Sequence, residues 1–480
     1  MRPCTLRIAS AEDDPKATSL AAVPVEHAPW CRTAPAALPI HIKPLAPVMR
    51  SRLLWRRSAT AVGLYAAVAL GLLGTVVASR VLGLESFGIY ATALVAASFV
   101  QTFLDLTVED SLTKFGFRYI AAEDWGRLRR LFGMALRFKI IGGALGCLVL
   151  IAFAPFANTV FGTSGLEAPI LASALLPLVQ APENVAATAL LLRGRYDLRG
   201  AYLTFSMALR LAAIVIGTQF GVWQAIACIV VAQALATIVL SFVGLSAFRR
   251  FPSAAPRPLG EDRAPIKSFV VRSSLATGML SMRTALAPLL LGVVAGPTQV
   301  GLFRIAQAPQ AGLSAATSPV RLVLLTEQTR DWEHGLEREV IAGVRRYMAA
   351  AAGMMAVALP LFLILMPWLV KVVFGSAYEG AVTAARIILL AAAIQVVLGW
   401  TKSLPVTIGR PSLRIQTHGI ETAILLPLVV GFGYTWGVTG AAIAILVSTA
   451  AFALAWAVVL ARLHGEVHGR PPIGKRGAAS

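Results

Sequence analysis

The residues with the clearest chemical potential in this chain are arginines that lie inside long apolar stretches. Arg210, Arg283 and Arg304 each lie in a stretch that is long enough to form a membrane-spanning helix. An arginine at the middle of a bilayer costs at least about 2.5 kcal/mol, so such side chains must face protein groups or a water-filled cavity. Guanidinium groups bind phosphate and carboxylate through paired hydrogen bonds. The sequence therefore predicts an anion-binding site in a central cavity.

Depth in the membrane ranks these candidates. Arg283 lies 14 residues after the start of the predicted helix 269–295, about 21 Å along its axis and near mid-bilayer. Arg304 lies one turn inside the outer end of the next predicted helix, and Gln307 follows it. Two more residues complete the set: Arg210, central in the predicted helix 201–219, and Asp105, near the end of 88–108. The predicted substrate-binding residues are therefore Arg283, Arg304, Arg210, Gln307 and Asp105.

Other motifs give no support for catalysis or for a metal site. Gly469–Lys475 fits the first seven positions of a phosphate-binding loop, but Arg476 stands where Ser or Thr should bind Mg²⁺. His464 and His468 have the i, i+4 spacing of a zinc site without its glutamate. No nucleophile–base pair or carboxylate pair can be assembled. The sequence thus gives no reason to expect an enzyme, a metal or a cofactor.

The composition is that of a polytopic membrane protein. Of the 480 residues, 57% are hydrophobic and 14% are charged, whereas soluble domains carry about 25% charged residues. The net charge of +20 would suggest nucleic acid as the partner of a soluble protein. Here the positions of the basic residues explain the charge, as shown below. The four cysteines have no ligand spacing and predict neither disulfides nor zinc.

Twelve segments are long and apolar enough to cross a bilayer, which requires about 20 helical residues. They are 58–79, 88–108, 133–155, 166–186, 201–219, 222–247, 269–295, 300–325, 346–370, 384–404, 418–435 and 438–461. The weakest are 166–186, which is interrupted by Pro177 and Pro182, and 201–219, which contains an arginine. The sequence therefore predicts an all-α polytopic membrane protein with twelve transmembrane helices.

The distribution of Lys and Arg gives the orientation. The termini and alternate loops on one side hold 31 basic residues, whereas the loops on the other side hold only Arg80 and Lys371. Basic residues collect on the cytoplasmic side of membrane proteins. The predicted location is therefore the inner (cytoplasmic) membrane, with both termini in the cytoplasm and no role for nucleic acid.

The chain contains one large internal repeat. Gly83–Tyr90 and Gly296–Phe303 both follow the order Gly, four residues, Gly, aliphatic, aromatic, at a shift of 213 residues. Three further pairs occur in the same order: Val160–Thr163 with Val373–Ser376, Gly194-Arg195 with Gly409-Arg410, and Gly221-Val222 with Gly437-Val438. Such order indicates two copies of one unit. With six helices each, the copies enter from the same side and are parallel repeats.

These observations predict five parts of the chain. Residues 1–48 are rich in Pro and Ala and are expected to be a disordered tail or a start-site artefact, since Met49 is a plausible start. The others are a first lobe at 52–247, a cytoplasmic linker at 248–267, a second lobe at 268–462 and a cytoplasmic tail at 463–480. Two Trp-containing loops, 123–128 and 330–336, are expected to form short amphipathic helices on the inner leaflet.

Ser79–Gly83 followed by Phe87–Ala91 resembles the connection between helices 1 and 2 of Wzx-type polysaccharide flippases, which belong to the multidrug/oligosaccharidyl-lipid/polysaccharide (MOP) exporter superfamily. The resemblance covers about 52–462. It implies two pseudo-symmetric six-helix lobes around a central cavity lined by helices 1, 2, 7 and 8. It also implies that cationic cavity residues hold the pyrophosphate of a polyprenyl-linked oligosaccharide during alternating access.

The expected function is therefore a flippase for surface polysaccharide biosynthesis (O-antigen, capsule or exopolysaccharide). Its expected partners are a lipid-linked oligosaccharide, membrane lipids, and a polysaccharide polymerase with glycosyltransferases. Subtracting 213 from the positions of Arg283 and Arg304 gives Leu70 and Ala91, so the anion site is expected to be one-sided. Two alternatives stay open. One is a cation-coupled drug or metabolite antiporter, with Asp105 as its acidic residue; the other is a membrane scaffold for a synthase complex.

Overall fold

The structure is a computed structural model that describes residues 47–104, 108–333, 336–408, 410 and 412–468. Contacts divide the chain into a unit of residues 1–53 and a unit of residues 54–480, and the packing described below is that of the second unit. The predicted tail at 1–48 lies outside the described residues except for its last two positions, which begin the first helix. Most of the predicted C-terminal tail, 469–480, lies outside them as well.

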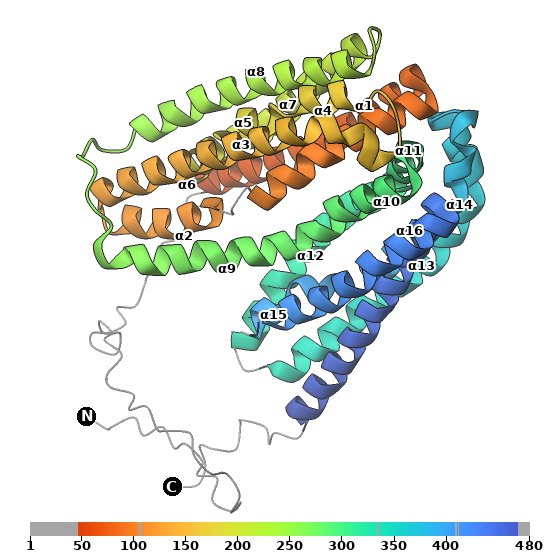
Figure 1. Cartoon of the computed structure of the whole chain (residues 1–480). Coiled ribbons are helices and arrows are strands. Elements are labelled where there is room, and N and C mark those ends of the chain that lie inside the picture. Colours follow the sequence, from red (N-terminus) through yellow and green to blue (C-terminus); the bar gives the residue numbers. More distant parts are fainter. Residues whose placement is uncertain (1–46, 105–107, 334–335, 409, 411, 469–480) are drawn as a thin grey trace, which may run out of the picture. The chain divides into compact units, whose positions relative to one another are not determined.

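Every regular element in the described residues is a helix, as the sequence predicts (Figure 1). The first half, here called the N-lobe, contains α1 (Pro47–Leu104), α2 (Val108–Ala121), α3 (Trp125–Phe161), α4 (Glu167–Ser173), α5 (Leu176–Gln180), α6 (Glu183–Leu192), α7 (Tyr196–Gly217) and α8 (Val222–Arg249). The second half, the C-lobe, contains α9 (Arg263–Ser281), α10 (Ala287–Ala295), α11 (Pro297–Ala306), α12 (Ala308–Glu333), α13 (Glu337–Val373), α14 (Val382–Val397), α15 (Leu404–Thr407) and α16 (Ser412–His468).

Short helices join some of these elements. A 3₁₀ turn at Gly260–Asp262 precedes α9, and a π-helical segment at Met282–Leu286 joins α9 to α10. Two more 3₁₀ segments, Ser376–Ala381 and Gly399–Lys402, flank α14. Helix covers each of the twelve predicted segments in whole or in large part, and eight helices within the described residues are long and apolar enough to cross a membrane. The number of crossings stays a prediction.

Glycines with positive φ mark equivalent positions of the repeat. Gly83 bends α1 at φ 74°, and Gly296 separates α10 from α11 at φ 87°. The paired positions Gly221 and Gly437 also have positive φ, with the second bending α16. Glycine adopts this conformation without the steric cost of a Cβ atom. The repeat seen in the sequence is therefore a repeat of backbone geometry.

The fourth predicted span is broken by its prolines. Pro177 lies at the start of α5, and Pro182 immediately precedes α6. Proline lacks the N–H that continues a helical ladder, so α4, α5 and α6 replace one regular helix. This confirms the predicted interruption, although the helical segment extends to Leu192, beyond the expected end at residue 186.

The expectation of short amphipathic helices in the two Trp-containing loops is wrong. At 123–128, Glu123 forms a turn with φ 54° and Asp124 caps α3 by accepting a hydrogen bond from the N–H of Arg127 at 3.0 Å. The amphipathic helix is α2, immediately upstream, which buries Leu112, Phe115 and Tyr119. At 330–336, the described residues end α12 at Glu333. The N-cap at Asp124 lets α3 begin at Trp125, before the apolar part of that helix.

The linker between the lobes packs against α2 and α3. The N–H of Arg257 donates to the carbonyl oxygen of Gly126 at 3.1 Å. Asp262 accepts from the Tyr119 hydroxyl at 3.1 Å and forms an ion pair with Arg127 at 3.3 Å. Burial, with a smaller contribution from the nearby Asp262 carboxylate, raises the pKa of Tyr119 to about 12. The phenol therefore stays protonated and keeps donating this hydrogen bond throughout the physiological range.

Small residues dominate where the helices pack most closely. α9 runs beside α2, while α10 packs against α16 (Figure 1). Alanines such as Ala225, Ala384 and Ala441 are fully buried in the largest core cluster. Membrane helices approach one another closely through such residues, because lipid tails remove the hydrophobic advantage of large side chains.

Candidate functional site

The two copies of the repeated motif lie against each other. A Cβ atom added to Gly88 would lie 2.5 Å from the carbonyl oxygen of Pro297, and one added to Gly301 would lie 3.0 Å from the Cα of Gly88. Gly88 and Gly301 are the equivalent glycines of the two copies. The pseudo-symmetric halves thus meet at their matching positions, backbone to backbone.

Polar contacts join the lobes at the same place. Arg80 donates from Nε to the carbonyl oxygen of Val373 at 2.8 Å, so it caps the end of α13. Its second guanidinium contact is with the carbonyl of Val372. The Tyr378 hydroxyl donates to the carbonyl oxygen of Ser79 at 2.7 Å. This set of contacts around Gly83 and Gly296 is called the joint below.

Just beyond the joint, cationic side chains from both lobes approach one another. Arg304 on α11 and Arg210 on α7 are close enough to interact electrostatically. Both guanidinium groups also interact electrostatically with Tyr90 on α1. Tyr90 is buried, whereas Arg304 is exposed to solvent and Arg210 is half-buried. Arg210 comes from the N-lobe, at a position without a counterpart in the repeat, whereas Arg283 and Arg304 belong to the C-lobe.

Arg304 is the exposed residue on a helical turn whose adjacent residues are buried. Its neighbours Phe303 and Ile305 are almost fully buried, with 1% and 0% exposure. Neither Arg304 nor Arg210 forms an ion pair with another described residue. Two like charges in such an environment repel each other, and an anion between them would relieve that repulsion. The arrangement can therefore bind a multivalent anion.

The other predicted site residues are placed only in part. Arg283 lies in the π-helical segment between α9 and α10, an irregularity that is frequent at functional sites; its side chain is outside the described atoms. Gln307 caps α11 and is half-buried. Asp105 lies outside the described residues. Arg386, near the start of α14 and outside the predicted set, donates from Nε to the carbonyl oxygen of Leu363 at 2.9 Å.

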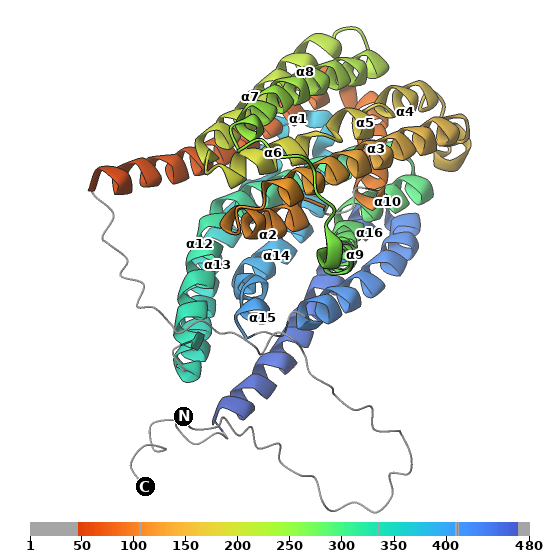
Figure 2. The same ribbon diagram turned by 90° about the vertical axis from the view of Figure 1, so that its left-hand side faces the viewer.

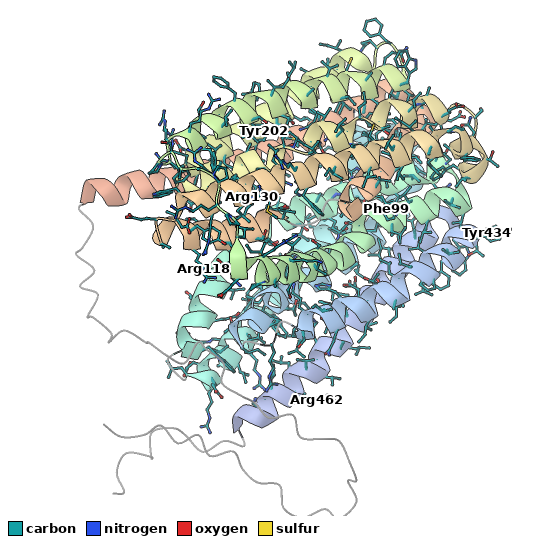
Figure 3. The ribbon with its side chains drawn as sticks, turned by 60° about the vertical axis from the view of Figure 1, so that its left-hand side comes forward. Phe99, Arg118, Arg130, Tyr202, Tyr434 and Arg462 are labelled. Carbon is teal, nitrogen blue, oxygen red and sulfur yellow. The ribbon has the colours of Figure 1, made fainter. Side chains whose placement is uncertain are left out.

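A second polar site lies inside the N-lobe. A cavity of about 170 Å³ is lined among others by Gln101, Gln180, Glu183, Tyr202, Arg210 and Gln233. Gln233 donates to the Glu183 carboxylate at 2.8 Å, and the Tyr202 hydroxyl lies beside the same carboxylate. Figure 3 shows Tyr202 among the N-lobe helices. Arg210 thus joins this cavity to the cationic site.

Glu183 is a candidate site residue that the sequence pattern did not indicate. The residue lies inside the predicted span 166–186, where a carboxylate signals function as strongly as an arginine does. In the sequence, Pro177 and Pro182 of the same span indicate a break in the helix and give no sign of a polar site. A carboxylate in a polar membrane cavity can take up a proton or a cation. Within the described residues, no three His, Cys, Asp or Glu side chains are grouped so that they could hold a metal ion.

Comparisons with known proteins agree with this architecture. A family model described as polysaccharide biosynthesis protein matches residues 77–383. None of the curated proteins compared with the chain matches it. Among solved structures, an inward-facing multidrug resistance MATE family transporter of the MOP superfamily is similar at a TM-score of 0.68 and 14% identity, covering 87% of this chain and 100% of its own.

Two other solved structures have the same fold. The lipid II flippase MurJ in an inward closed conformation is similar at a TM-score of 0.63 and 12% identity, over 85% of this chain and 90% of its own. A MOP superfamily transporter from Pyrococcus furiosus, described as having a binding pocket of reverse polarity, is similar at 0.59 and 12% identity, over 86% and 96%. The chain is thus a multi-pass membrane protein with the fold of MOP-superfamily transporters, and it belongs to the polysaccharide biosynthesis protein family.

Proposed function

We propose that this protein is a flippase that moves a polyprenyl-pyrophosphate-linked oligosaccharide across the cytoplasmic membrane by alternating access. The observation that carries the proposal is the approach of Arg304 and Arg210 from opposite lobes around Tyr90. A pyrophosphate carries several negative charges and suits guanidinium groups on two sides. Because one cation belongs to each lobe, the bound anion would respond to the relative movement of the lobes.

The remaining parts of the proposal follow from this substrate. Arg283 lies in the π-helical segment of the C-lobe, and we assign it to the pyrophosphate together with Arg304. Gln307, at the end of the same helix as Arg304, would bind a neighbouring polar group of the substrate. Glycosyltransferases that build the oligosaccharide and a polymerase that extends it are the expected partners of such a flippase.

Arg304→Ala should reduce polysaccharide export per inserted molecule by about 100-fold, because losing one partner of a charged, hydrogen-bonded pair costs about 2–5 kcal/mol. Arg304→Lys should restore part of the export, since an ammonium group lacks the bidentate fork. The measurement compares surface polysaccharide with the amount of inserted protein, and it follows the lipid-linked precursor on the inner side. The precursor should accumulate in the alanine variant.

Arg386→Ala is the matched control, since that exposed arginine donates to a helix carbonyl and is not part of the proposed site, so export per molecule should stay unchanged. If Arg304→Ala and Arg283→Ala both export at the wild-type rate per inserted molecule, the pyrophosphate does not bind at this site. A parallel fall of protein abundance and export, with their ratio constant, would show that the arginines only brace the bundle.

The second candidate function is a cation-coupled antiporter for a drug or metabolite. Glu183 in its polar N-lobe cavity favours it, since such a carboxylate can bind the coupling cation. Asp105, the acidic residue expected for this function, is outside the described residues. Deletion of the gene separates the two functions: loss of surface polysaccharide supports the flippase, whereas increased drug sensitivity with normal polysaccharide supports the antiporter.

We also propose that both termini lie in the cytoplasm of a cell with the protein in its inner membrane. Figure 3 shows Arg118 and Arg130, from the basic 109–139 region, away from Tyr434 near the bend of α16. Single cysteines at Ser164 and Ser376, both exposed, should react with an impermeant thiol reagent applied outside, in a background without native cysteines. A cysteine at Arg257 should not react. If only the cysteine at position 257 is labelled, the protein has the opposite orientation in the membrane.

A further inference from the structure

The C-lobe contains a groove that the proposed transport does not use. It has a volume of about 900 Å³ and lies between α13, α14 and the second part of α16. Figure 2 shows α14 between α13 and α16, which have few contacts with each other. Small side chains make the space, among them Ala352 and Ala356 of α13, Ala393 of α14 and Ala457 of α16.

Apart from one end, the lining of this groove is apolar. The charged or titratable side chains in the lining are Arg345 of α13 and His464 of α16. Both lie toward the predicted cytoplasmic ends of their helices. From Arg345 to Pro360, also in the lining, the groove runs about 22 Å along α13 by the helical rise. That length exceeds one leaflet of the hydrocarbon core, which is about 15 Å thick.

The outer side of α13 indicates what surrounds the groove. Val357 and Ile364 are 77% and 74% exposed, respectively, on a helix whose other face is buried. Exposed aliphatic side chains in the middle of a spanning helix face lipid tails. Ala352, Ala356 and Pro360, which line the groove, are exposed on the same helix. The groove therefore opens toward the bilayer, from which a lipid chain can enter sideways.

The repeat provides a comparison within the same molecule. With the shift of 213 residues that relates α3 to α13, Arg345 corresponds to Phe132. With the shift of 216 residues that relates Gly221 to Gly437, His464 corresponds to Phe248. The rings of Phe132 and Phe248 pack together with centroids 4.6 Å apart. The N-lobe thus fills with two aromatic rings the position where the C-lobe has two groups able to carry positive charge.

We propose that the C-lobe groove binds one molecule of an anionic phospholipid of the inner leaflet. One acyl chain lies between α13, α14 and α16, and the phosphate lies against Arg345 and His464. The choice of an anionic headgroup rests on charge complementarity, since Arg345 forms no ion pair with another described residue. The negative surface of the cytoplasmic leaflet attracts such residues. Lipid binding in this groove is independent of the transported substrate.

Native mass spectrometry of the purified full-length protein tests the proposal. The protein is mixed with equal amounts of phosphatidylglycerol and phosphatidylcholine that have identical acyl chains. The wild type should retain phosphatidylglycerol preferentially. Arg345→Ala should reduce that preference about fivefold, as expected for the loss of one basic residue near a lipid phosphate. The double variant Arg345→Phe with His464→Phe, which copies the N-lobe, should lose the retained lipid.

Arg346→Ala is the matched control, because Arg346 is also exposed but pairs with Glu339 at 3.6 Å and does not line the groove. It should bind lipid as the wild type does. The same selectivity in Arg345→Ala and the wild type would overturn the proposal. Retention of the lipid by the double phenylalanine variant would also overturn it. The same holds if a polyprenyl phosphate, added as a third competitor, is retained preferentially. It holds as well if the wild type is a dimer that the two phenylalanine substitutions dissociate.

Discussion

Gly88→Ala should lower the stability of the joint by about 1–3 kcal/mol and reduce export correspondingly, by roughly 5- to 150-fold. The new methyl group would lie 2.5 Å from the carbonyl oxygen of Pro297 and 2.9 Å from the Cα of Thr298. Both are backbone atoms, which cannot rotate away as a flexible side chain can. Relief therefore requires that α1 and α11 separate, and the contacts of Arg80 and Tyr378 across the joint would weaken with them.

Two other glycines set the scale of this effect. Gly71 lies in α1 with no atom within 4 Å of an added Cβ, so Gly71→Ala should be neutral or slightly stabilising. Gly301→Ala should have an intermediate effect, because its nearest contact is at 3.0 Å. Thermal unfolding in detergent and export per inserted molecule give the two measurements. Equal results for Gly88→Ala and Gly71→Ala would contradict a tight contact between the lobes.

Glu183→Gln should abolish most of the transport while the protein stays folded and inserted. The amide preserves the size of the side chain, and Gln233 can still hydrogen-bond to its oxygen. It removes the charge that would exchange a proton or a cation during the cycle. If this carboxylate couples an ion to lobe movement, its loss removes a coupling free energy of about 1–3 kcal/mol, or 5- to 150-fold in transport. Export per inserted molecule measures the effect.

The matched control for this prediction is Glu167→Gln. Glu167 begins α4 in the same broken segment, but it is exposed and lies outside the polar cavity. The control should export polysaccharide normally. Glu183 would be a purely structural residue if Glu183→Gln loses thermal stability and abundance while each remaining molecule exports at the wild-type rate.

Several features of the fold follow from the sequence alone because they depend on local or repeated patterns. Apolar runs predict helices, and Pro177 and Pro182 predict the break in the fourth span. The repeat predicts glycines of special conformation, and Gly83 and Gly296 both have positive φ. The amphipathic helix predicted at 123–128 is not present, because Asp124 caps α3 and the residues from Trp125 onward belong to that long helix. The cap hydrogen bond, and not the polar and apolar pattern of these few residues, decides where the helix begins.

The approach of charged groups from distant helices was decided only by the tertiary structure. Arg304 and Arg210 are 94 positions apart, and the repeat relates neither of them to the other. Glu183 became a candidate only when α6, α7 and α8 enclosed it with Gln233 and Tyr202. The C-lobe groove likewise depends on where alanines of three helices face one another. A one-dimensional pattern gives depth in the membrane and the buried face of a helix, but the partner across that face depends on how the helices pack together.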